Sequence, residues 1–264
     1  MIKIPVQLKN PGEYFACLGL WELAEKLNRS KEPTRGYFEF NPQRSVFRSN
    51  FCIETDLAEV DLLNGLYSCK AKAEDPESPL SLVYFGAPIN LTLDWWLTKS
   101  DRSNLKTWSG RVKGPQIIVD MLEMAKVSKI QKIDNVFKER SFRSRKGIQH
   151  LLYLDTTSAG GSYRGYSTDE AGVKVAEPYF VEFLAAIGLQ RFRPFHDEEK
   201  NEFCYVTWTR PLTCNQAFIA IRYGVPLLGT RHFVFHLKLK GSQGYYQFCS
   251  AEEQKRRVSI LSSN

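Results

Sequence analysis

The stretch NPGEYFACLGLWELAEKL, residues 10–27, has the start signal and the apolar content of a buried helix. Asn10 suits the N-cap, and Pro11 suits the first helical position, where a missing N–H needs no partner. Glu13 follows the cap by three residues, as in a capping box. Apolar side chains then form a stripe at helical spacing over three turns, so this stretch predicts a helix packed on a sheet.

Strand-like segments lie on both sides of this helix. Residues 2–8 (IKIPVQL) alternate loosely between apolar and polar, and Pro5 indicates an edge strand or a strand end. Residues 36–40 (GYFEF) and 45–53 (SVFRSNFCI) read as two further short strands. The acidic, proline-containing residues 73–79 (AEDPESP) predict a surface loop.

The same reading of the remaining chain predicts further helices and strands. Helices are expected after Pro115 and after Pro178 and over residues 213–223, because each segment has apolar residues at helical spacing. Strands are expected at 82–96, ending at the pair Trp95 and Trp96, and at 148–154, 203–210, 232–239 and 245–249.

Two of the expected helices share a short sequence echo. Residues 14–20 (YFACLGL) and 183–189 (FLAAIGL) both follow a helix-starting proline and both end in Gly-Leu. The echo is consistent with an internal duplication. One short match cannot establish a repeat, so we favour the simpler interpretation of two buried helices that each need a small residue where they cross a sheet.

The composition favours a globular protein with a polyanionic partner. Of 264 residues, 43% are hydrophobic, and the net charge is +7 with a pI near 9.0. The start MIKIPVQLKN lacks a secretory h-region and no apolar run could span a bilayer, so we expect a cytoplasmic protein without membrane contact. The six cysteines form no CxxC pair, which predicts reduced, structural thiols.

The positive charge is concentrated in the middle of the chain. Residues 99–146 contain thirteen Lys and Arg against five acids, whereas residues 50–79 are acidic and should avoid phosphate. The planar guanidinium of an arginine in a loop can donate two hydrogen bonds to one phosphate, and an aromatic ring beside it can stack on a base. The candidate nucleic-acid-binding residues are Lys99, Arg102, Lys106, Trp108, Arg111, Lys113, Arg140, Arg143, Arg145 and Lys146. A solvated helix face that only aids solubility is the alternative.

A glycine-rich segment, SAGGSYRGYS, follows this basic stretch and predicts a flexible loop. Exposed backbone N–H groups together with Arg164 would suit a clamp on a nucleic-acid backbone or a flipped base. A connection without any function is the competing interpretation.

No constellation for catalysis or for a cofactor stands out. His232 and His236 have the HxxxH spacing of a zinc face, but a strand there would separate them by roughly 13 Å. His232 or His150 could act as general base in metal-independent RNA cleavage. Asp155 and Asp169 flank the glycine-rich loop without the spacing of a Mg²⁺ site, so we expect no metal, no cofactor and no catalytic residue.

Several segments together resemble a known family. NPGEYFACLGLWELAEKL, LDWW, LKTWSG, PYFVEFLAAIGLQRFRP, YVTWTRPL and FHLKLKGSQGYYQF look like the smaller CRISPR-associated protein of type I-U (now I-G) effector loci. The likeness runs discontinuously from Pro5 to Phe248. It implies a component of, or accessory to, a Cascade-like complex in antiviral defence, with CRISPR RNA or target DNA and other Cas subunits as partners.

One departure from this family concerns the start of the glycine-rich segment. Where relatives have a DSRRG-like sequence, this chain has DTTSAG at residues 155–160. If an arginine there contacts phosphate in the relatives, this chain must use Arg164 or do without the contact. In such loci RNA processing and DNA degradation belong to other proteins, which argues against a catalytic role.

The fold expected from the segments and from the family is α+β, built from ferredoxin-like (RAMP-like) βαββ units. In it, helices cover one face of a mainly antiparallel sheet. We expect one domain, with two such halves at about 1–98 and 150–250 joined by a basic helical segment at 99–149. The leading functional hypothesis is a non-catalytic nucleic-acid-binding subunit of a type I effector. The alternatives are a metal-independent RAMP-like endoribonuclease and a protein-protein adaptor that docks through exposed tryptophans.

Overall fold

The computed structural model describes residues 1–40, 48–97, 105–109, 112–142, 151–159, 176–223, 229–240 and 244–254. Within them the chain is an α+β protein, and every described strand pairing is antiparallel. The helices are α1 (Pro11–Leu27), α2 (Glu59–Ser68), α3 (Gly114–Ser128), α4 (Ile133–Val136), α5 (Tyr179–Arg191), α6 (Cys214–Tyr223) and a 3₁₀ turn, η1 (Thr156–Ala159). None of them is long and apolar enough to cross a membrane, within the residues described.

The described strands form two four-stranded sheets and three smaller ones. The first sheet has the order β1 (Ile2–Gln7), β3 (Arg48–Glu54), β2 (Arg35–Phe40), β11 (Leu212–Thr213). The second has the order β15 (Glu252–Gln254), β12 (Arg231–Phe235), β10 (Glu202–Thr207), β9 (Phe195–Asp197). The smaller sheets are β4–β5–β6 (Ala71–Ala73, Val83–Phe85, Leu91–Leu93), β7–β8 (Ser141–Phe142, Ala176–Glu177) and β13–β14 (Leu237–Lys240, Tyr245–Phe248).

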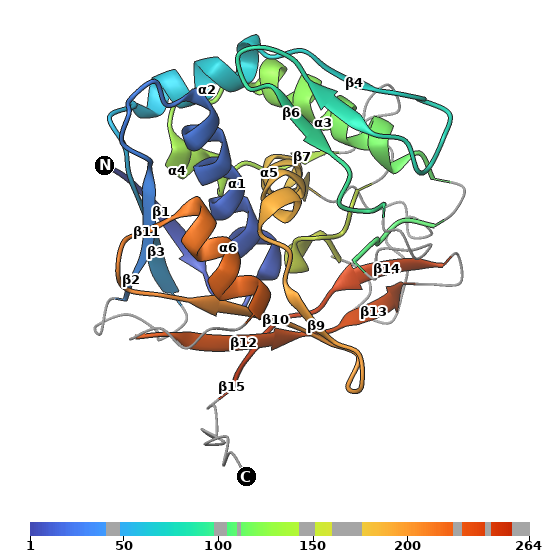
Figure 1. The fold of residues 1–264 in the computed structure, drawn as a ribbon. Coiled ribbons are helices and arrows are strands. Elements are labelled where there is room, and N and C mark those ends of the chain that lie inside the picture. Colours follow the sequence, from blue (N-terminus) through green and yellow to red (C-terminus); the bar gives the residue numbers. More distant parts are fainter. Residues whose placement is uncertain are drawn as a thin grey trace.

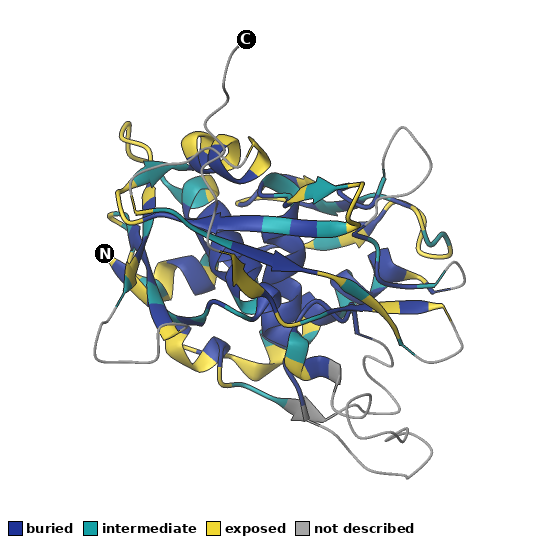
Figure 2. Cartoon of the chain, turned by 90° about the horizontal axis from the view of Figure 1, so that it is seen from below, coloured by how far each residue is buried: buried dark blue, intermediate teal, exposed yellow. Residues whose placement is uncertain are grey.

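Helices α1 and α5 lie side by side at the centre of the molecule (Figure 1). Helices α2 and α3 lie above this pair, and strands β10, β12, β13 and β14 lie below it (Figure 1). The helix pair is buried almost all round, and Figure 2 shows the dark-blue buried ribbon running through the middle with exposed segments at the periphery. Apolar side chains from Ile2 to Ala251 form one contiguous core around it.

Aromatic side chains connect α1 to both four-stranded sheets. Tyr14 of α1 stacks on Phe38 of β2 and on Tyr205 of β10, with ring centroids 5.6 and 4.2 Å apart. The indole N–H of Trp208, which follows β10, donates to the carbonyl of Gly36 in β2 at 2.7 Å. The two sheets are therefore held together across the start of α1.

Most elements expected from the sequence are present. Asn10 caps α1 and accepts a hydrogen bond from the Gly12 N–H at 3.1 Å, and β1, with Pro5 in it, is an edge strand. Glu13 does not close the expected capping box, because its carboxylate accepts from the backbone N–H of Gln7 at 2.7 Å. The helices after Pro115 and Pro178 and at 213–223 are confirmed as α3, α5 and α6.

Four expectations about the elements are wrong. The single stripe on α1 is replaced by burial on nearly every side, since α5 covers the face turned away from the sheets. Residues 151–154 are buried without forming a strand, because Tyr153 has φ 58°, which interrupts an extended chain. The strand expected at 82–96 is two strands, β5 and β6, and the strand expected at 232–239 is also two, β12 and β13.

The sequence echo has a structural explanation of a third kind. Gly19 of α1 and Gly188 of α5 lie where the two helices cross each other. We had expected each glycine to mark the point where its helix crosses a sheet, and this expectation was wrong. Small residues are needed here because the two helix backbones approach closely.

Candidate nucleic-acid interface

The predicted stacking residue Trp108 belongs to the hydrophobic core. It is 3% exposed and packs edge-on against Trp95 and Trp96, with ring centroids 5.8 and 5.6 Å apart. Its indole N–H donates to the carbonyl of Pro79 at 3.1 Å. Stacking on a base would require the ring to leave this cluster.

Two predicted lysines lie close to the same tryptophan. The ammonium group of Lys106 is 5.7 Å from the centroid of the Trp108 ring. Lys113, at the start of α3, forms an ion pair with Glu77 in the acidic loop. That loop, which we expected only to avoid phosphate, therefore compensates one of the predicted phosphate-binding charges.

Arg140 lies in a different place, beside the start of α1. Its guanidinium donates to the carbonyls of Phe137 and Glu139 at 3.3 and 3.0 Å. Burial raises the pKa of Glu13 to about 7, and the nearby charge of Arg140 opposes this rise. The remaining predicted residues lie outside the described residues: Lys99, Arg102, Arg111, Arg143, Arg145, Lys146 and Arg164.

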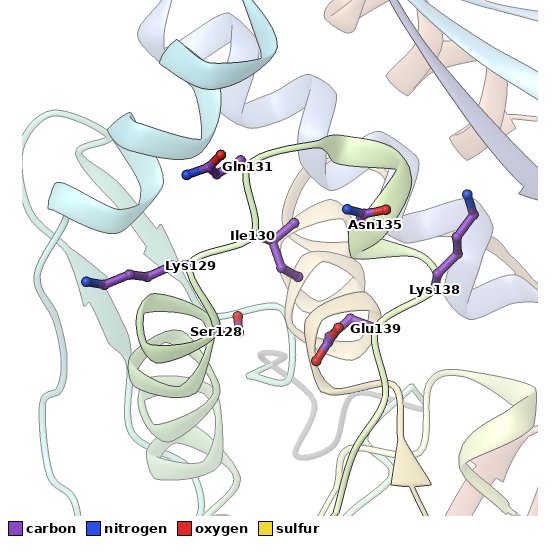
Figure 3. A pocket seen from close by; sticks show the side chains of 7 residues that line it. All are labelled: Ser128, Lys129, Ile130, Gln131, Asn135, Lys138 and Glu139. Carbon is purple, nitrogen blue, oxygen red and sulfur yellow. The ribbon is translucent and has the colours of Figure 1, made fainter.

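A polar hollow of about 430 Å³ lies within the basic stretch, where α3 ends and α4 begins. Lys129 ends α3 in the left-handed conformation, with φ 47°, and so turns the chain toward α4. In Figure 3 the side chains of Lys129 and Lys138 extend on opposite sides of this turn. The hollow is lined by Ser128, Lys129, Ile130, Gln131, Asn135, Lys138 and Glu139.

Helix α2 holds the rim of this hollow in place. The hydroxyl of Tyr67 donates to the carbonyl of Ile130 at 2.8 Å, and Ile130 itself is buried. The carboxylate of Glu59 accepts from the backbone N–H of Ile133 at 3.2 Å. The turn between α3 and α4 is thus fixed by tertiary contacts from a separate element.

Two exposed lysines, Lys129 and Lys138, line the hollow, and a third, Lys132, lies between them in the turn from α3 to α4. Across the described ranges none of the three side chains forms an ion pair or hydrogen bond. Lys126, one turn before them, instead pairs with Glu123 at 2.7 Å. Uncompensated ammonium groups beside amide and hydroxyl groups suit a phosphate-bearing ligand, and the half-buried Glu139 is the acid on the rim.

A second polar cluster lies under the start of the glycine-rich segment. The amide of Asn10 donates to Asp155 at 2.9 Å, and the Asp155 carboxylate also accepts from the backbone N–H of Thr157 at 2.7 Å. The carboxylate of Glu182 accepts from Ser158 Oγ at 2.6 Å. These bonds tie η1 to α1 and α5, and they occupy Asp155 in a structural role.

The described residues do not form a metal site, and three of the four histidines lie among them. No group of three or more His, Cys, Asp or Glu side chains among them could hold a metal ion. His232 lies in β12 and His236 just after it, 3.7 Å from Glu202, while His150 and Asp169 lie outside the described ranges. All six cysteines are free thiols.

The five tryptophans exclude one predicted kind of docking surface. Trp21, Trp95, Trp96, Trp108 and Trp208 are each at most 3% exposed. An adaptor that docks through exposed tryptophans was therefore a wrong expectation. Large apolar side chains are buried on folding because this removes them from water, and these tryptophans follow that rule.

Comparison with known proteins finds no family model, curated protein or solved structure that matches the chain.

The three lysines at the turn between α3 and α4 were not predicted from the sequence, because we gave most weight to arginine in loops. Two of them had a signal in the sequence, because the run KVSKIQK places a lysine at every third position across the end of the helix, at Lys126, Lys129 and Lys132; Lys138 lies outside this run.

Proposed function

We propose that this protein is a non-catalytic nucleic-acid-binding subunit of, or accessory to, a type I CRISPR RNA-guided effector complex in the cytoplasm. The observation that carries the proposal is a set of uncompensated lysines at the turn between α3 and α4: Lys129 and Lys138, which line the polar hollow, and Lys132 between them. Each can release a counterion from a phosphate chain, which is the main source of affinity in such binding. The family resemblance suggests guide RNA or target DNA as the chain that is bound.

The topology of the first half supports a RAMP-like relationship. Strands β1, β2 and β3 with α1 follow the order strand, helix, strand, strand, and β3 lies between β1 and β2 in the sheet. That arrangement is the one expected of a βαββ unit. In the second half, β10 lies between β9 and β12, which follow different helices, so the second unit rests on analogy alone.

The test is a binding titration with labelled single-stranded RNA at several salt concentrations. We expect Lys129→Ala, Lys132→Ala and Lys138→Ala together to weaken binding. The slope of log K against log salt should fall by about 2, since each lost contact on a single strand contributes about 0.7. Fluorescence anisotropy measures both quantities.

The matched control removes two lysines of the same segment whose charges are already compensated. Lys113→Ala with Lys126→Ala breaks the pairs with Glu77 and Glu123, and it should leave the salt slope nearly unchanged. Equal effects of the two sets of substitutions would refute the role of the hollow. Absence of salt-sensitive RNA or DNA binding in the intact protein would refute the function itself.

A further inference from the structure

Helix α6 exposes an apolar and cationic face that nothing in the described chain covers. Phe218, Ile219 and Tyr223 are 37%, 48% and 70% exposed, and Arg222 lies exposed among them. The opposite side of the helix is buried through small and aliphatic residues. Neighbouring exposed apolar groups on a helix, one turn apart, are typical of a helix that docks into a groove.

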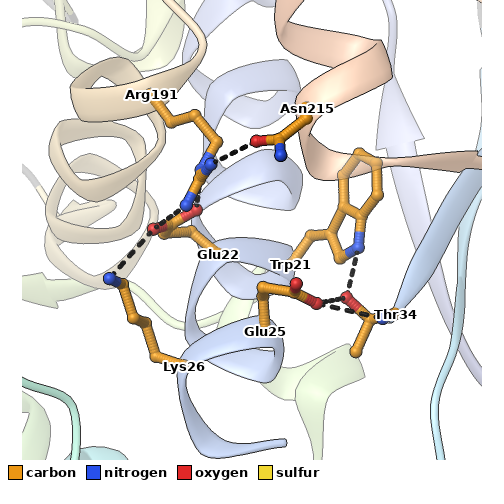
Figure 4. Close-up of polar contacts among 7 residues, drawn as sticks. All are labelled: Trp21, Glu22, Glu25, Lys26, Thr34, Arg191 and Asn215. Carbon is orange, nitrogen blue, oxygen red and sulfur yellow. Dashed lines mark hydrogen bonds and ion pairs between the residues drawn. The ribbon is translucent and has the colours of Figure 1, made fainter. Parts of the chain in front are cut away.

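This face is held rigidly by polar contacts from the central helices (Figure 4). Arg191 of α5 donates to Asn215 of α6 at 3.0 Å and to Glu22 of α1 at 3.1 Å. Its bidentate contact with Glu22 joins α5 to α1, and its hydrogen bond to Asn215 joins α6 to both. A preorganised surface loses less conformational entropy on binding.

The charges around α6 argue for a protein partner over a phosphate chain. Arg191 is already paired with Glu22, and Arg193 lies 3.3 Å from Asp94. Arg222, the charged residue of α6 itself, has no ion pair or hydrogen bond from its side chain among the described residues. This face, with one cation among three large apolar side chains, is complementary to a partner surface that has apolar side chains at its floor and a few carboxylates.

The chain itself offers such a surface at the end of α1. Two adjoining hollows, of about 600 and 280 Å³, share the residues Asn28, Ser30 and Asp56 and so form one cleft. The larger hollow has apolar groups from Leu27, Leu57 and Pro88. Helix α2 packs closely against Leu27 here because residue 65 is a glycine. A Cβ on Gly65 would lie 2.5 Å from Leu27 Cδ1.

The rim of the cleft carries more acids than bases. Asp56 and Asp61 are exposed, and no side-chain bond is found for either among the described residues. Glu32 and Glu54 line the smaller hollow, while Arg29 and Arg35 are the basic residues of the cleft. The cleft is therefore complementary to α6 in charge as well as in its apolar floor.

We propose that copies of this chain associate head to tail, with α6 of one copy seated in the cleft between the end of α1 and α2 of the next. In this contact Phe218 and Ile219 meet the apolar floor, and Arg222 meets Asp61 or Asp56. The donor and acceptor surfaces belong to different elements, so the contact is heterologous, and a dimer of two copies keeps one free α6 and one free cleft for further copies. This association is independent of nucleic-acid binding at the hollow.

The test is sedimentation velocity of the nuclease-treated full chain over a range of concentrations. The α6 variant, Ile219→Ser with Arg222→Glu, removes the donor surface, and the cleft variant, Asp56→Arg with Asp61→Arg, removes the acceptor surface. We expect the unaltered chain to grow in size with concentration and each variant to associate at least about tenfold more weakly. A mixture of the two variants should form a one-to-one dimer and stop there.

Charge reversal on both sides provides a second check. Arg222→Glu together with Asp61→Arg in one chain restores an opposite-charge pair between copies, so association should recover toward that of the unaltered chain. The control, Val127→Ser with Lys70→Glu, changes an exposed apolar residue and a cation elsewhere and should have no effect. Circular dichroism confirms that each variant is folded.

Three results would overturn the proposal. The unaltered chain could remain monomeric at every concentration. The α6 variant could lose association while the cleft variant keeps it, which would mean that α6 packs on α6 of a second copy. The α6 variant could instead lose RNA affinity without any change in association, which would assign α6 to a phosphate chain.

Discussion

Gly19 and Gly188 face each other at the crossing of α1 and α5, and each leaves room for the backbone of the opposite helix. A Cβ on Gly19 would lie 2.0 Å from the carbonyl oxygen of Leu184, and a Cβ on Gly188 would lie 2.0 Å from that of Phe15. In each helix the obstructing carbonyl belongs to the residue four positions before the glycine. The crossing is thus nearly symmetric, and the close approach of the two backbones depends on both glycines.

Gly19→Ala should therefore be severely destabilising. The added methyl group meets backbone on the other helix, which cannot move aside as a flexible side chain could, so we expect a loss of about 3 kcal/mol in the free energy of unfolding. Urea denaturation followed by circular dichroism measures it. Gly86→Ala is the control, because a Cβ there finds no neighbour closer than the Lys70 carbonyl at 3.6 Å. If both variants lost equal stability, the helix crossing would not be the cause.

Trp108→Ala should affect folding far more than nucleic-acid binding. Removing a buried tryptophan typically costs about 3–5 kcal/mol, and here the loss opens a space beside Trp95 and Trp96. Trp108→Phe keeps most of the packing and should bind RNA as tightly as the unaltered chain. Thermal unfolding and RNA anisotropy separate the two effects. A folded Trp108→Phe protein with clearly weaker RNA binding would instead show that the indole contacts the ligand.

The ion pair between Glu22 and Arg191 should couple the two central helices energetically. Glu22 is nearly fully buried, whereas the Arg191 side chain is 28% exposed, so Glu22→Gln is expected to cost about 2 kcal/mol, less than for a fully buried pair. In an Arg191→Met background the same substitution should cost much less. A double-mutant cycle from urea denaturation gives the coupling. If the losses in the free energy of unfolding from the two single substitutions simply added, the ion pair itself would contribute nothing to stability.

The sequence predicted best those elements whose signals are local. Asn10 and Pro11 mark the start of α1. The apolar residues at helical spacing after Pro115 are all buried in α3: Ile117, Ile118, Met121, Leu122 and Ala125. Local signals are sufficient there because capping and helical periodicity depend on neighbours within one or two turns. The interruption at Tyr153 had no such signal, since this residue with positive φ is bonded to a distant part of the chain: its carbonyl accepts from the N–H of Phe248 at 3.0 Å.

The candidate site was predictable only in part, because charge in a sequence does not reveal which charges are compensated. Lys113 and Lys129 look alike in the sequence, yet Lys113 pairs with Glu77, which lies thirty-six residues away along the chain. Trp108 was misjudged for a similar reason, since its neighbours Trp95 and Trp96 turn it into a core residue. Long-range pairing of this kind follows from the fold and is not encoded in local spacing.

Glu182 should make the stability of the protein depend on pH. Burial raises its pKa to about 8, while one carboxylate oxygen accepts from Asp155 N–H and Ser158 and the other has no hydrogen-bond partner. Between pH 4.5, the usual pKa of the side chain, and about 8 the folded state therefore holds a proton that the unfolded state has lost. This contribution to stability is fully present below that window and is lost as pH rises through it.

Glu182→Gln keeps the shape of the protonated side chain and removes its titration. We expect the variant to gain stability relative to the unaltered chain as pH rises from about 5 to 8, with the difference levelling off above the folded-state pKa. Urea denaturation at several pH values measures this difference, and Glu13, whose pKa is also raised, contributes equally to both proteins. Glu123→Gln, on an exposed side chain, is the control and should show no such trend. A pH-independent difference for Glu182→Gln would mean that Glu182 is ionised in the folded protein, its charge stabilised by the bonds from Ser158 and Asp155.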